Sequence, residues 1–457
     1  MDDVSKNDDV SKKDDNVKKN DKVHVGTITF NENKENLLHS GSYGTQIYKG
    51  SILSKTECVV KIIDAKNYKD KPPEKRELHA LTTLRHSNVI KCYGYEKKDD
   101  LYYIVLDLCI GSLEDFIQGK IKDRISPEIW DKFQKWNRLE ILKQLTNGLA
   151  HIHEQNIVHR NLRPKNVLIQ TEHNENLVAV ISDFVFSKPL DLGSNYSIQS
   201  DQNNDQLAWL APEVERDSEY TTASDIFSLG CLYYYTLTNG KFLFCTGKVD
   251  PMRIHQNIIA DRKKPEDEQA KELFACKNDR YSSMDLISNM VRANPDERRT
   301  AQSLKQRRAH PMFWEANHKM RFVKAVRVVQ GEEEESRSLT PIENALESVA
   351  SNVFVDWIKE IEKIPKIEND SANRTGIDLA HHIRTNPYGG RNYVKYSTKL
   401  TFLIRMIRNY KEHKNSFNLG DGITIFTDQF PKLIIEVYKA MATFKTNEEL
   451  EDFYLKD

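Results

Sequence analysis

The sequence predicts an α+β fold followed by an all-α C-terminal segment. The order of its strand-like and helix-like segments and its length support this prediction. Residues 23–108 contain short runs of β-branched and aromatic residues, which are typical of strands. Beyond about residue 110 the pattern becomes mainly helical, with glycine and proline at the breaks. Strands that precede helices in this way indicate an α+β chain. At 457 residues the chain is long enough for two or three domains.

The elements are expected in the following order. Strands fall within residues 23–53 and at 57–63, a charged helix at 73–84, and further strands at 89–95 and 101–108. The most apolar stretch, at 226–245, is interrupted by Ser, Thr, Asn, Gly and Lys. Such a stretch is typical of a buried helix and not of a membrane span.

Composition excludes several classes of protein. The net charge of −1 gives no indication of a polyanionic partner for the chain as a whole. The six cysteines are scattered and form no Cys-x-x-Cys pair, which argues against a disulfide framework or a zinc site. The N-terminus is charged throughout and resembles no signal peptide. We therefore expect a cytoplasmic protein that does not enter a membrane.

Composition also shifts at two places along the chain. Residues 1–22 are a near-repeat of Asp-Asp-Val-Ser-Lys units, so a disordered charged tail is expected there. Four consecutive glutamates at 332–335 mark a flexible acidic loop near residues 331–341. We expect one folded domain at residues 23–314 and a second at 315–457, with the acidic loop inside the second.

The strand-rich segment carries two motifs that suit phosphate binding. Gly41-Ser42-Tyr43-Gly44 fits the last two glycines of a phosphate-covering loop, although His39 stands where the first glycine is expected. Val59-Val60-Lys61 ends in a lysine that can pair with phosphates, and Glu77 follows at the spacing of a glutamate that orients this lysine.

The helical segment continues the series. Residues 159–166 read His-Arg-Asn-Leu-Arg-Pro-Lys-Asn, and Asp183-Phe184-Val185 follows at a distance suited to a metal-binding aspartate. Ala211-Pro212-Glu213 comes next, with Arg298 placed to pair with Glu213, and residues 225–230 read Asp-Ile-Phe-Ser-Leu-Gly.

In order and spacing these motifs resemble those of protein kinases. The resemblance implies a bilobal protein-kinase-like fold for residues 23–314. It also implies a site for ATP or ADP, in which two residues, Asn166 and Asp183, would also hold Mg²⁺. The residues carried over to the nucleotide are Gly41, Gly44, Lys61, Glu77, Asn166 and Asp183.

Residues 159–166 depart from the kinase pattern at the position of the catalytic base. A kinase has aspartate there, whereas this chain has Asn161, and an amide has no useful basicity near neutral pH. Loss of a general base typically costs about 10²–10⁴-fold in rate. Arg163 also replaces the usual lysine, and Val185 replaces a glycine. The sequence therefore predicts a pseudokinase.

The C-terminal segment is locally basic. Residues 381–414 carry eight Lys or Arg against one acid, with tyrosine and phenylalanine interleaved. Such a run suits RNA, because cations neutralise phosphates while bases stack on rings. The same pattern is also typical of a solvated basic helix face.

Helical spacing assigns faces to one part of this run. Four residues recur at core spacing: Leu400, Leu403, Ile404 and Ile407. Asn409 and His413 fall on the opposite side, with Arg408 at the edge. Phe402 and Met406 are also expected to point outward, which would suit a partner or ligand surface.

Arg408-Asn409-Tyr410-Lys411-Glu412-His413 follows a segment that ends in His310-Pro311-Met312-Phe313-Trp314. This arrangement resembles the kinase-extension nuclease domain of ribonuclease L and of the kinase–endoribonuclease sensors of the unfolded-protein response. Asp356-Trp357 and the run at residues 426–441 resemble the same domain. The ankyrin repeats, the luminal domain and the transmembrane segment of those relatives are not apparent in this chain.

The resemblance implies metal-independent cleavage of RNA to 2′,3′-cyclic phosphate and 5′-hydroxyl ends. The residues carried over as catalytic are Tyr396, Arg408, Asn409 and His413, with Tyr393 as an alternative to Tyr396. It also implies a homodimer or higher oligomer whose pairing is favoured by nucleotide. Two alternatives stay open: a catalytically silent pseudokinase scaffold, and an active Ser/Thr kinase with a basic docking extension.

Overall fold

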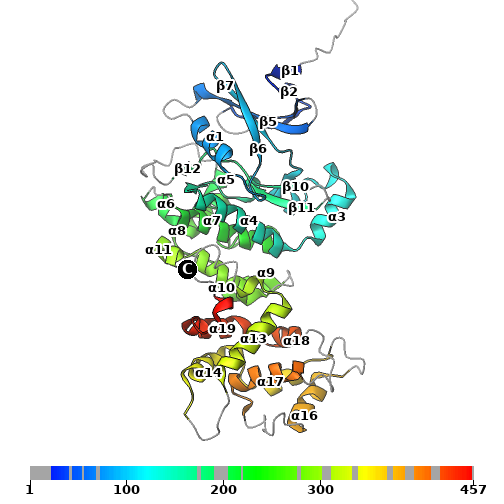
Figure 1. The fold of residues 1–457 in the computed structure, drawn as a ribbon, viewed down its shortest axis with the longest axis vertical. Helices are drawn as coiled ribbons and strands as arrows, with labels where there is room; N and C mark the ends of the chain where they lie inside the picture. Colours follow the sequence, from blue (N-terminus) through cyan, green and yellow to red (C-terminus); the bar gives the residue numbers. More distant parts are fainter. Residues whose placement is uncertain are drawn as a thin grey trace, which may run out of the picture. The chain divides into compact units, whose positions relative to one another are not determined.

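The structure is a computed structural model that describes residues 22–40, 44–53, 56–67, 73–171, 176–189, 204–217, 220–274, 279–300, 310–331, 338–367, 374–385, 396–412 and 423–454. The chain forms two compact units. One contains the residues up to Thr82 together with Lys91–Leu108, and the other contains Thr83–Ile90 and the residues from Cys109 onward. The predicted α+β class is confirmed, with one sheet-rich unit and one helix-rich unit (Figure 1).

The first unit is built on an antiparallel sheet of seven strands. Its order is β1-β2-β4-β5-β7-β6, and β3 pairs with β4. β-branched and aromatic residues form these strands because they pack well on a pleated, half-buried surface. Phe30, Tyr48, Val60 and Tyr103 belong to the core of this unit. The bounds are β1 Lys22–Val25, β2 Ile28–Asn31, β3 Leu37–Ser40, β4 Gln46–Ile52, β5 Thr56–Asp64, β6 Cys92–Lys98, β7 Leu101–Leu106 and helix α1 Pro73–Thr83.

The second unit begins with short sheets and a set of helices. β10 (Val167–Thr171) pairs with β8 (Gly111–Ser112) and β11 (Leu177–Ile181), and β9 (Ile157–Val158) pairs with β12 (Lys188–Pro189). The helices are α2 Leu113–Ile117, α3 Pro127–Lys135, α4 Arg138–Glu154, α5 Asn204–Leu207, α6 Pro212–Asp217, α7 Thr222–Leu237, α8 Pro251–Ile259, α9 Glu266–Phe274, α10 Arg280–Met290 and α11 Pro295–Thr300.

Helix α7 is the buried helix that the sequence predicts for the apolar stretch. Thr221 caps its N-terminus, in a capping box with Ser224, and nearly every residue from Ala223 to Leu237 is buried. Within the described part of the chain, no helix combines the length and apolar character needed to cross a membrane.

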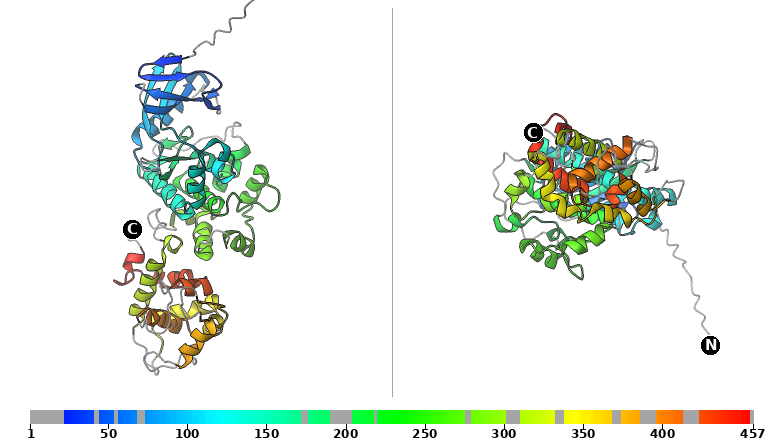
Figure 2. Two further views of the ribbon diagram at one scale, coloured as in Figure 1. Left: turned by 90° about the vertical axis from the view of Figure 1, so that its right-hand side faces the viewer. Right: turned by 90° about the horizontal axis from the view of Figure 1, so that it is seen from below.

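The remaining helices gather in one bundle, which both views of Figure 2 show in yellow to red. They share an apolar core that includes the fully buried Trp357 and the aromatic residues Phe322, Phe426 and Tyr438. The bounds are α13 Ala316–Gln330, α14 Pro341–Val353, α15 Trp357–Glu362, α16 Gly376–Thr385, α17 Leu400–Glu412, α18 Thr424–Gln429 and α19 Leu433–Met441.

Two predicted segments fall partly or wholly outside the described residues. The charged tail does so up to residue 21, and Lys22 already begins β1. The four glutamates at 332–335 also lie outside them. On either side, helix α13 ends at Gln330, and Thr340 caps α14 in a capping box with Glu343.

A carboxylate joins this bundle to helix α10. Asp285 accepts hydrogen bonds from His310 Nε2 at 3.1 Å and from Lys439 Nζ at 2.6 Å. Burial by itself raises the pKa of Asp285, but the bonds and charges of His310 and Lys439 outweigh it and lower that pKa. The ion pair therefore ties α19 to α10 within the second unit.

Candidate functional sites

The predicted lysine–glutamate pair is formed in the first unit. Lys61 Nζ lies 2.6 Å from Glu77 Oε1, and the two side chains are only 6% and 2% exposed. Lys61 sits at the centre of the sheet, where β5 pairs with β4 and β7, and Glu77 lies on α1. Gly44 has φ +72°, a backbone angle that glycine adopts without strain, and Gly41 lies outside the described residues.

A buried aspartate shapes the loop at residues 159–166, which we call the catalytic loop. Asp225 accepts the backbone N–H groups of His159 and Arg160, each at 2.8 Å, and lies 2.9 Å from His153 Nε2. Burial alone raises the pKa of Asp225, but the bond and charge of His153 and the neighbouring His159 outweigh it and lower the pKa. Arg160 has φ +67°, a strained angle that this anchoring holds in place.

Asn161 is enclosed in a network of hydrogen bonds. Its Nδ2 donates to Asp183 Oδ2 at 2.9 Å, and its Oδ1 accepts from Gln206 Nε2 at 3.4 Å. Asn166 Nδ2 donates to the backbone oxygen of Asn161 at 2.7 Å. Asn161 is only 7% exposed, so the residue at the base position is held between Asp183 and the segment that contains Gln206.

The fit of Mg²⁺ to this loop depends on Asp183 and Asn166. Magnesium needs oxygen ligands in near-ideal octahedral geometry. Both side chains carry such an oxygen, and Asp183 Oδ2 also accepts a hydrogen bond from the Asn161 amide at 2.9 Å. A carboxylate that accepts one hydrogen bond can still bind a cation, so the two residues fit the ion. Magnesium binding stays a prediction from the resemblance.

Cations of the catalytic loop face the segment around α5. Lys165 Nζ lies 2.5 Å from Asp205 Oδ2, next to the residue that contacts Asn161. Arg163 is largely buried, and this burial lowers the pKa of its guanidinium, although Asp183, Asp205 and Glu114 oppose the change. Two successive residues of α5 thus contact two residues of the catalytic loop.

The ion pair predicted between Glu213 and Arg298 is present. Arg298 Nη2 lies 2.5 Å from Glu213 Oε2, and Arg298 Nη1 donates to the backbone oxygen of Ala223 at 2.7 Å. Both side chains are buried, so the pair fixes the start of α6 against α7. Asp183, which precedes Glu213 in the chain, has φ +66°. The next residue, Phe184, is fully buried against His159.

Helix α17 carries two of the predicted nuclease residues, Arg408 and Asn409, but the burial of its other residues differs from the expectation. The four predicted core residues, from Leu400 to Ile407, are buried as expected. Phe402 and Met406 were expected to point outward, which is wrong, since they are 7% and 0% exposed. The reason is that α17 is covered on more than one side, by helices α13 and α14 among others. Among its residues with described side chains, Arg408 and Asn409 are the least buried.

Tyr396 stacks on one of these buried rings. Its ring centroid lies 4.0 Å from that of Phe402, with the planes 10° apart. The Arg405 guanidinium lies 5.7 Å from the centroid of the Phe402 ring. Trp357 Nε1 donates to the backbone oxygen of Tyr396 at 3.2 Å. Arg405 was not among the residues predicted from the sequence. Its spacing of three from Phe402 and four from Asn409 is the signal that could have identified it.

Arg408 and Asn409 lie side by side near the other end of the helix. Arg408 Nη1 donates to Asn409 Oδ1 at 2.9 Å, and both side chains are partly buried. Phe402 and Arg408 are six residues apart, which corresponds to about 9 Å along a helix. Tyr396 is therefore grouped with Phe402 and not directly with Arg408. His413 and Tyr393 lie outside the described residues.

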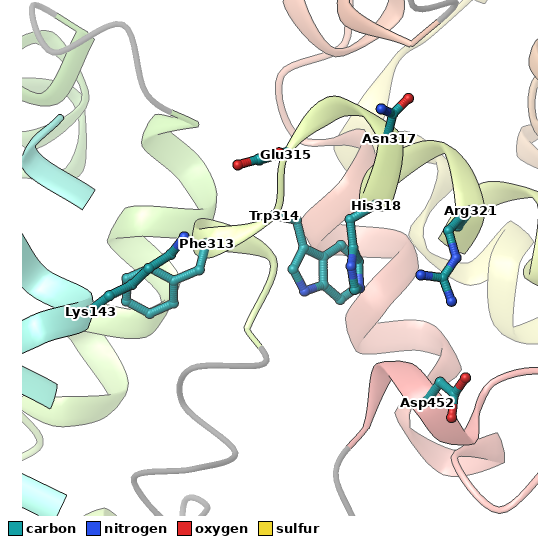
Figure 3. A pocket seen from close by; sticks show the side chains of 8 residues that line it. All are labelled: Lys143, Phe313, Trp314, Glu315, Asn317, His318, Arg321 and Asp452. Carbon is teal, nitrogen blue, oxygen red and sulfur yellow. The ribbon is translucent and has the colours of Figure 1, made fainter. Parts of the chain in front are cut away.

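A separate hollow of about 420 Å³ lies beside the start of α13 (Figure 3). Lys143, Arg321 and Asp452 contribute charged groups to its lining. The Trp314 and His318 rings lie together there, with centroids 4.7 Å apart, and burial lowers the pKa of His318. The described residues that line it include none of the predicted nucleotide or nuclease residues.

The comparisons with known proteins agree with both groups of motifs. Residues 33–311 match the protein kinase domain. The chain is 29% identical over 421 residues to the serine/threonine-protein kinase/endoribonuclease ire-1 of Caenorhabditis elegans, covering 89% of this chain and 38% of the relative. It is 28% identical over 452 residues to the serine/threonine-protein kinase/endoribonuclease IRE2 of Homo sapiens, covering 95% of this chain and 43% of the relative.

A plant relative gives the same result. The serine/threonine-protein kinase/endoribonuclease IRE1b of Arabidopsis thaliana is 27% identical over 466 residues, covering 93% of this chain and 48% of the relative. The chain thus spans less than half the length of these relatives. The resemblance to kinase–endoribonucleases that the motifs indicate is confirmed over most of the chain. Because the kinase domain match covers more than half of its residues, the chain belongs to the protein kinase family.

Proposed function

We propose that this chain is an endoribonuclease that cleaves RNA without a metal ion, leaving 2′,3′-cyclic phosphate and 5′-hydroxyl ends. One observation carries the proposal. The Arg408–Asn409 pair lies partly buried on α17, in a chain that aligns along 89% of its length with a named kinase/endoribonuclease. A guanidinium beside an amide, neither of them fully buried, is suited to bind an RNA phosphate.

Each proposed residue has a chemical role in attack of a ribose 2′-hydroxyl on the adjacent phosphate. Arg408 offers two parallel hydrogen bonds to the phosphate as its charge grows in the transition state. Asn409 positions the phosphate or a base through its amide. His413 donates a proton to the leaving 5′-oxygen, since imidazole titrates near neutral pH. Tyr396 accepts or relays the 2′-hydroxyl proton.

A cation lies beside the ring on which Tyr396 stacks. The Arg405 guanidinium is 5.7 Å from the centroid of the Phe402 ring.

A stem-loop RNA tests the nuclease proposal directly. We expect Arg408→Ala to lower the cleavage rate by about 10²–10³-fold, as removal of a transition-state hydrogen-bond donor does in other enzymes. The matched control is Arg292→Ala, which removes an exposed guanidinium paired with Glu297 in the kinase half and should leave cleavage unchanged. Equal rates for the wild-type chain and Arg408→Ala would end the proposal.

The kinase half is proposed as a nucleotide-binding, dimerising regulator of the nuclease. The buried Lys61–Glu77 pair supports this, because a lysine oriented by a glutamate is suited to pair with phosphates. Sedimentation should give a homodimer or higher oligomer that ATP or ADP favours. A monomer with undiminished RNA cleavage would contradict the dimer.

The other readings are weaker on specific grounds. Against an active kinase stands Asn161, which has no basicity and whose amide is bonded to Asp183. Against a silent scaffold stands the Arg408–Asn409 pair.

The domain bounds proposed here are 1–22, 23–314 and 315–457. A cytoplasmic setting is supported by the free thiols of the described cysteines.

A further inference from the structure

Helix α17, which carries Arg408 and Asn409, begins directly after a lysine. The first backbone N–H groups of an α-helix have no partner inside the helix, so another group has to accept their hydrogen bonds. A serine, threonine, aspartate or asparagine at the N-cap usually does so. The residue before α17 is Lys399, whose ammonium group can only donate. The acceptor for these N–H groups therefore has to come from another residue.

Glu347 of α14 supplies this acceptor. Its Oε1 accepts hydrogen bonds from Thr401 N at 3.0 Å and from Thr401 Oγ1 at 2.7 Å. Its Oε2 accepts one from Leu400 N at 3.3 Å. Leu400 and Thr401 are the first two residues of α17, and both are buried. A carboxylate suits this place, because the N-terminus of a helix carries a partial positive charge. Both oxygens of one side chain therefore hold the start of α17.

The helix that presents Glu347 is itself fixed in the bundle. Leu346, next to Glu347 in the chain, is fully buried in the bundle core, and Ala350 is buried in the same core. Towards the end of α14, Asn352 Nδ2 donates to Glu436 Oε2 on α19 at 2.8 Å. The Glu347 carboxylate is thus presented from a well-anchored helix, and it holds α17 to that helix.

The contact lies on the same face of α17 as the proposed nuclease residue Arg408. Thr401 and Arg408 are seven positions apart, which is nearly two helical turns and about 10 Å along the axis. Residues at this spacing share one face of a helix. Tyr396 is held by a different helix, since Trp357 Nε1 of α15 donates to its backbone oxygen at 3.2 Å. A shift or rotation of α17 would therefore move Arg408 relative to Tyr396.

We infer that Glu347 is a positioning residue of the proposed nuclease. Its carboxylate fixes the start of α17 on α14, and this sets where Arg408 stands relative to Tyr396 and the RNA phosphate. The inference rests on the nuclease function proposed above. Placement matters because a shift of about 1 Å can cost on the order of 10²-fold in rate. Glu347 acts through α17 and not by contact with RNA, so it affects the rate of cleavage and not the binding of RNA.

The test measures single-turnover cleavage of a stem-loop RNA by the full chain. It also measures the dissociation constant of a 2′-O-methyl copy of that RNA, which has no 2′-hydroxyl to attack the phosphate. For Glu347→Ala we expect the rate at saturating RNA to fall by about tenfold or more. The dissociation constant should stay within about twofold of the wild-type value, as for a loss confined to the transition state. Equal cleavage rates for Glu347→Ala and the wild-type chain would overturn the inference.

A change at Lys399 separates positioning from simple capping. Lys399→Ser places a favourable N-cap residue before α17. In that background Glu347→Ala should leave the melting temperature unchanged, whereas in the wild-type background it should lower it by about 2–4 °C. The loss of cleavage should be the same in both backgrounds, because a local cap does not tie α17 to α14. If Lys399→Ser abolished both losses, Glu347 would only cap the helix, and the inference would be overturned.

The matched control is another capping carboxylate. Asp250 Oδ1 accepts a hydrogen bond from Met252 N at 3.1 Å at the N-terminus of α8, in the kinase half. Asp250→Ala should lower the melting temperature much as Glu347→Ala does and leave RNA cleavage unchanged. An equal loss of cleavage in both variants would trace the effect to stability alone and overturn the inference.

A conservative variant carries the test if Glu347→Ala fails to fold. Glu347→Gln keeps the size of the side chain but replaces one acceptor oxygen with a donor, which then faces a backbone N–H. It should slow cleavage without changing RNA binding, and a wild-type rate would overturn the inference. A wild-type chain that leaves the RNA intact would instead overturn the proposed nuclease function, and the inference with it.

Discussion

The polar side chains of the catalytic loop and of the C-terminal part of α17 differ in their burial and in their hydrogen-bond partners. In the loop, Asn161 is 7% exposed and bonded on both sides to other parts of the chain. Near the end of α17, Arg408 and Asn409 are only partly buried and bonded to each other. A polar group held by internal partners stabilises the fold, whereas one that keeps access to solvent can reach a substrate.

On the proposed function, the difference separates a regulatory half from a catalytic half. The kinase half keeps the ion pairs that organise its loops, namely Lys61–Glu77 and Glu213–Arg298. Asn161 stands at the position where phosphoryl transfer uses an aspartate as base. The C-terminal half combines a buried helix with a less buried polar pair, an arrangement that would hold the proposed nuclease residues on a rigid support.

The largest expected effect concerns the proposed acid of the nuclease. His413→Ala should lower RNA cleavage by about 10²–10⁴-fold, the usual cost of losing a general acid. The assay is cleavage of a stem-loop RNA under single-turnover conditions. His79→Ala, which removes an exposed histidine on α1, is the control and should cleave at the wild-type rate. Full activity of His413→Ala would contradict the proposed role of His413 as the general acid of the nuclease.

The next effect concerns the catalytic loop. Incubation of the wild-type chain with labelled ATP and a generic protein substrate should give no detectable phosphate transfer, since loss of the base costs about 10²–10⁴-fold. The measurement is phosphate incorporation against an active kinase as reference. Clear incorporation by the wild-type chain would show that Asn161 does not silence the kinase half.

A third effect tests how the core supports the segment that leads into α17. Trp357 is fully buried and donates a hydrogen bond to the backbone of Tyr396. Trp357→Ala should lower the free energy of unfolding by about 3–5 kcal/mol. Denaturant unfolding measures the loss, and Val355→Ala, at a position 84% exposed, should show none. A stable Trp357→Ala chain would mean that this ring does not organise the bundle.

The smallest effect concerns the ion pair between α10 and α19, for which the sign with pH can be worked out. The pKa of Asp285 is lowered, so its stabilising effect is present above the ordinary carboxyl pKa and is lost as pH falls through the lower value in the fold. The pKa of Lys439 is raised, so its effect is lost only as pH rises through that raised value. The pair should therefore stabilise fully between about pH 4 and pH 10.

Asp285→Asn tests this window. It should lower the free energy of unfolding by about 1–2 kcal/mol near neutral pH, the low end for a charged hydrogen bond, because Lys439 is half-exposed and screened. The difference in melting temperature from the wild-type chain should shrink below about pH 4. Asp267→Asn alters an exposed pair with Lys271 and serves as the control. A difference that grows in acid would contradict the sign.

Residue identity and spacing predicted much of the kinase half. The Lys61–Glu77 and Glu213–Arg298 pairs were predicted because short motifs specify both partners. The bond of Asn161 to Gln206 could not be predicted, because the two residues are 45 positions apart and no motif links them. Phe402 and Met406 were misplaced because helical periodicity assumes one covered side, whereas α17 is covered on several.

The most direct test of the central claim is the chemistry of the RNA ends left by the wild-type chain, with and without EDTA. We predict 2′,3′-cyclic phosphate and 5′-hydroxyl ends at equal rates in both conditions, because a guanidinium and an imidazole can perform the cleavage unaided. Cleavage that stops in EDTA, or products with 3′-hydroxyl and 5′-phosphate ends, would contradict the account.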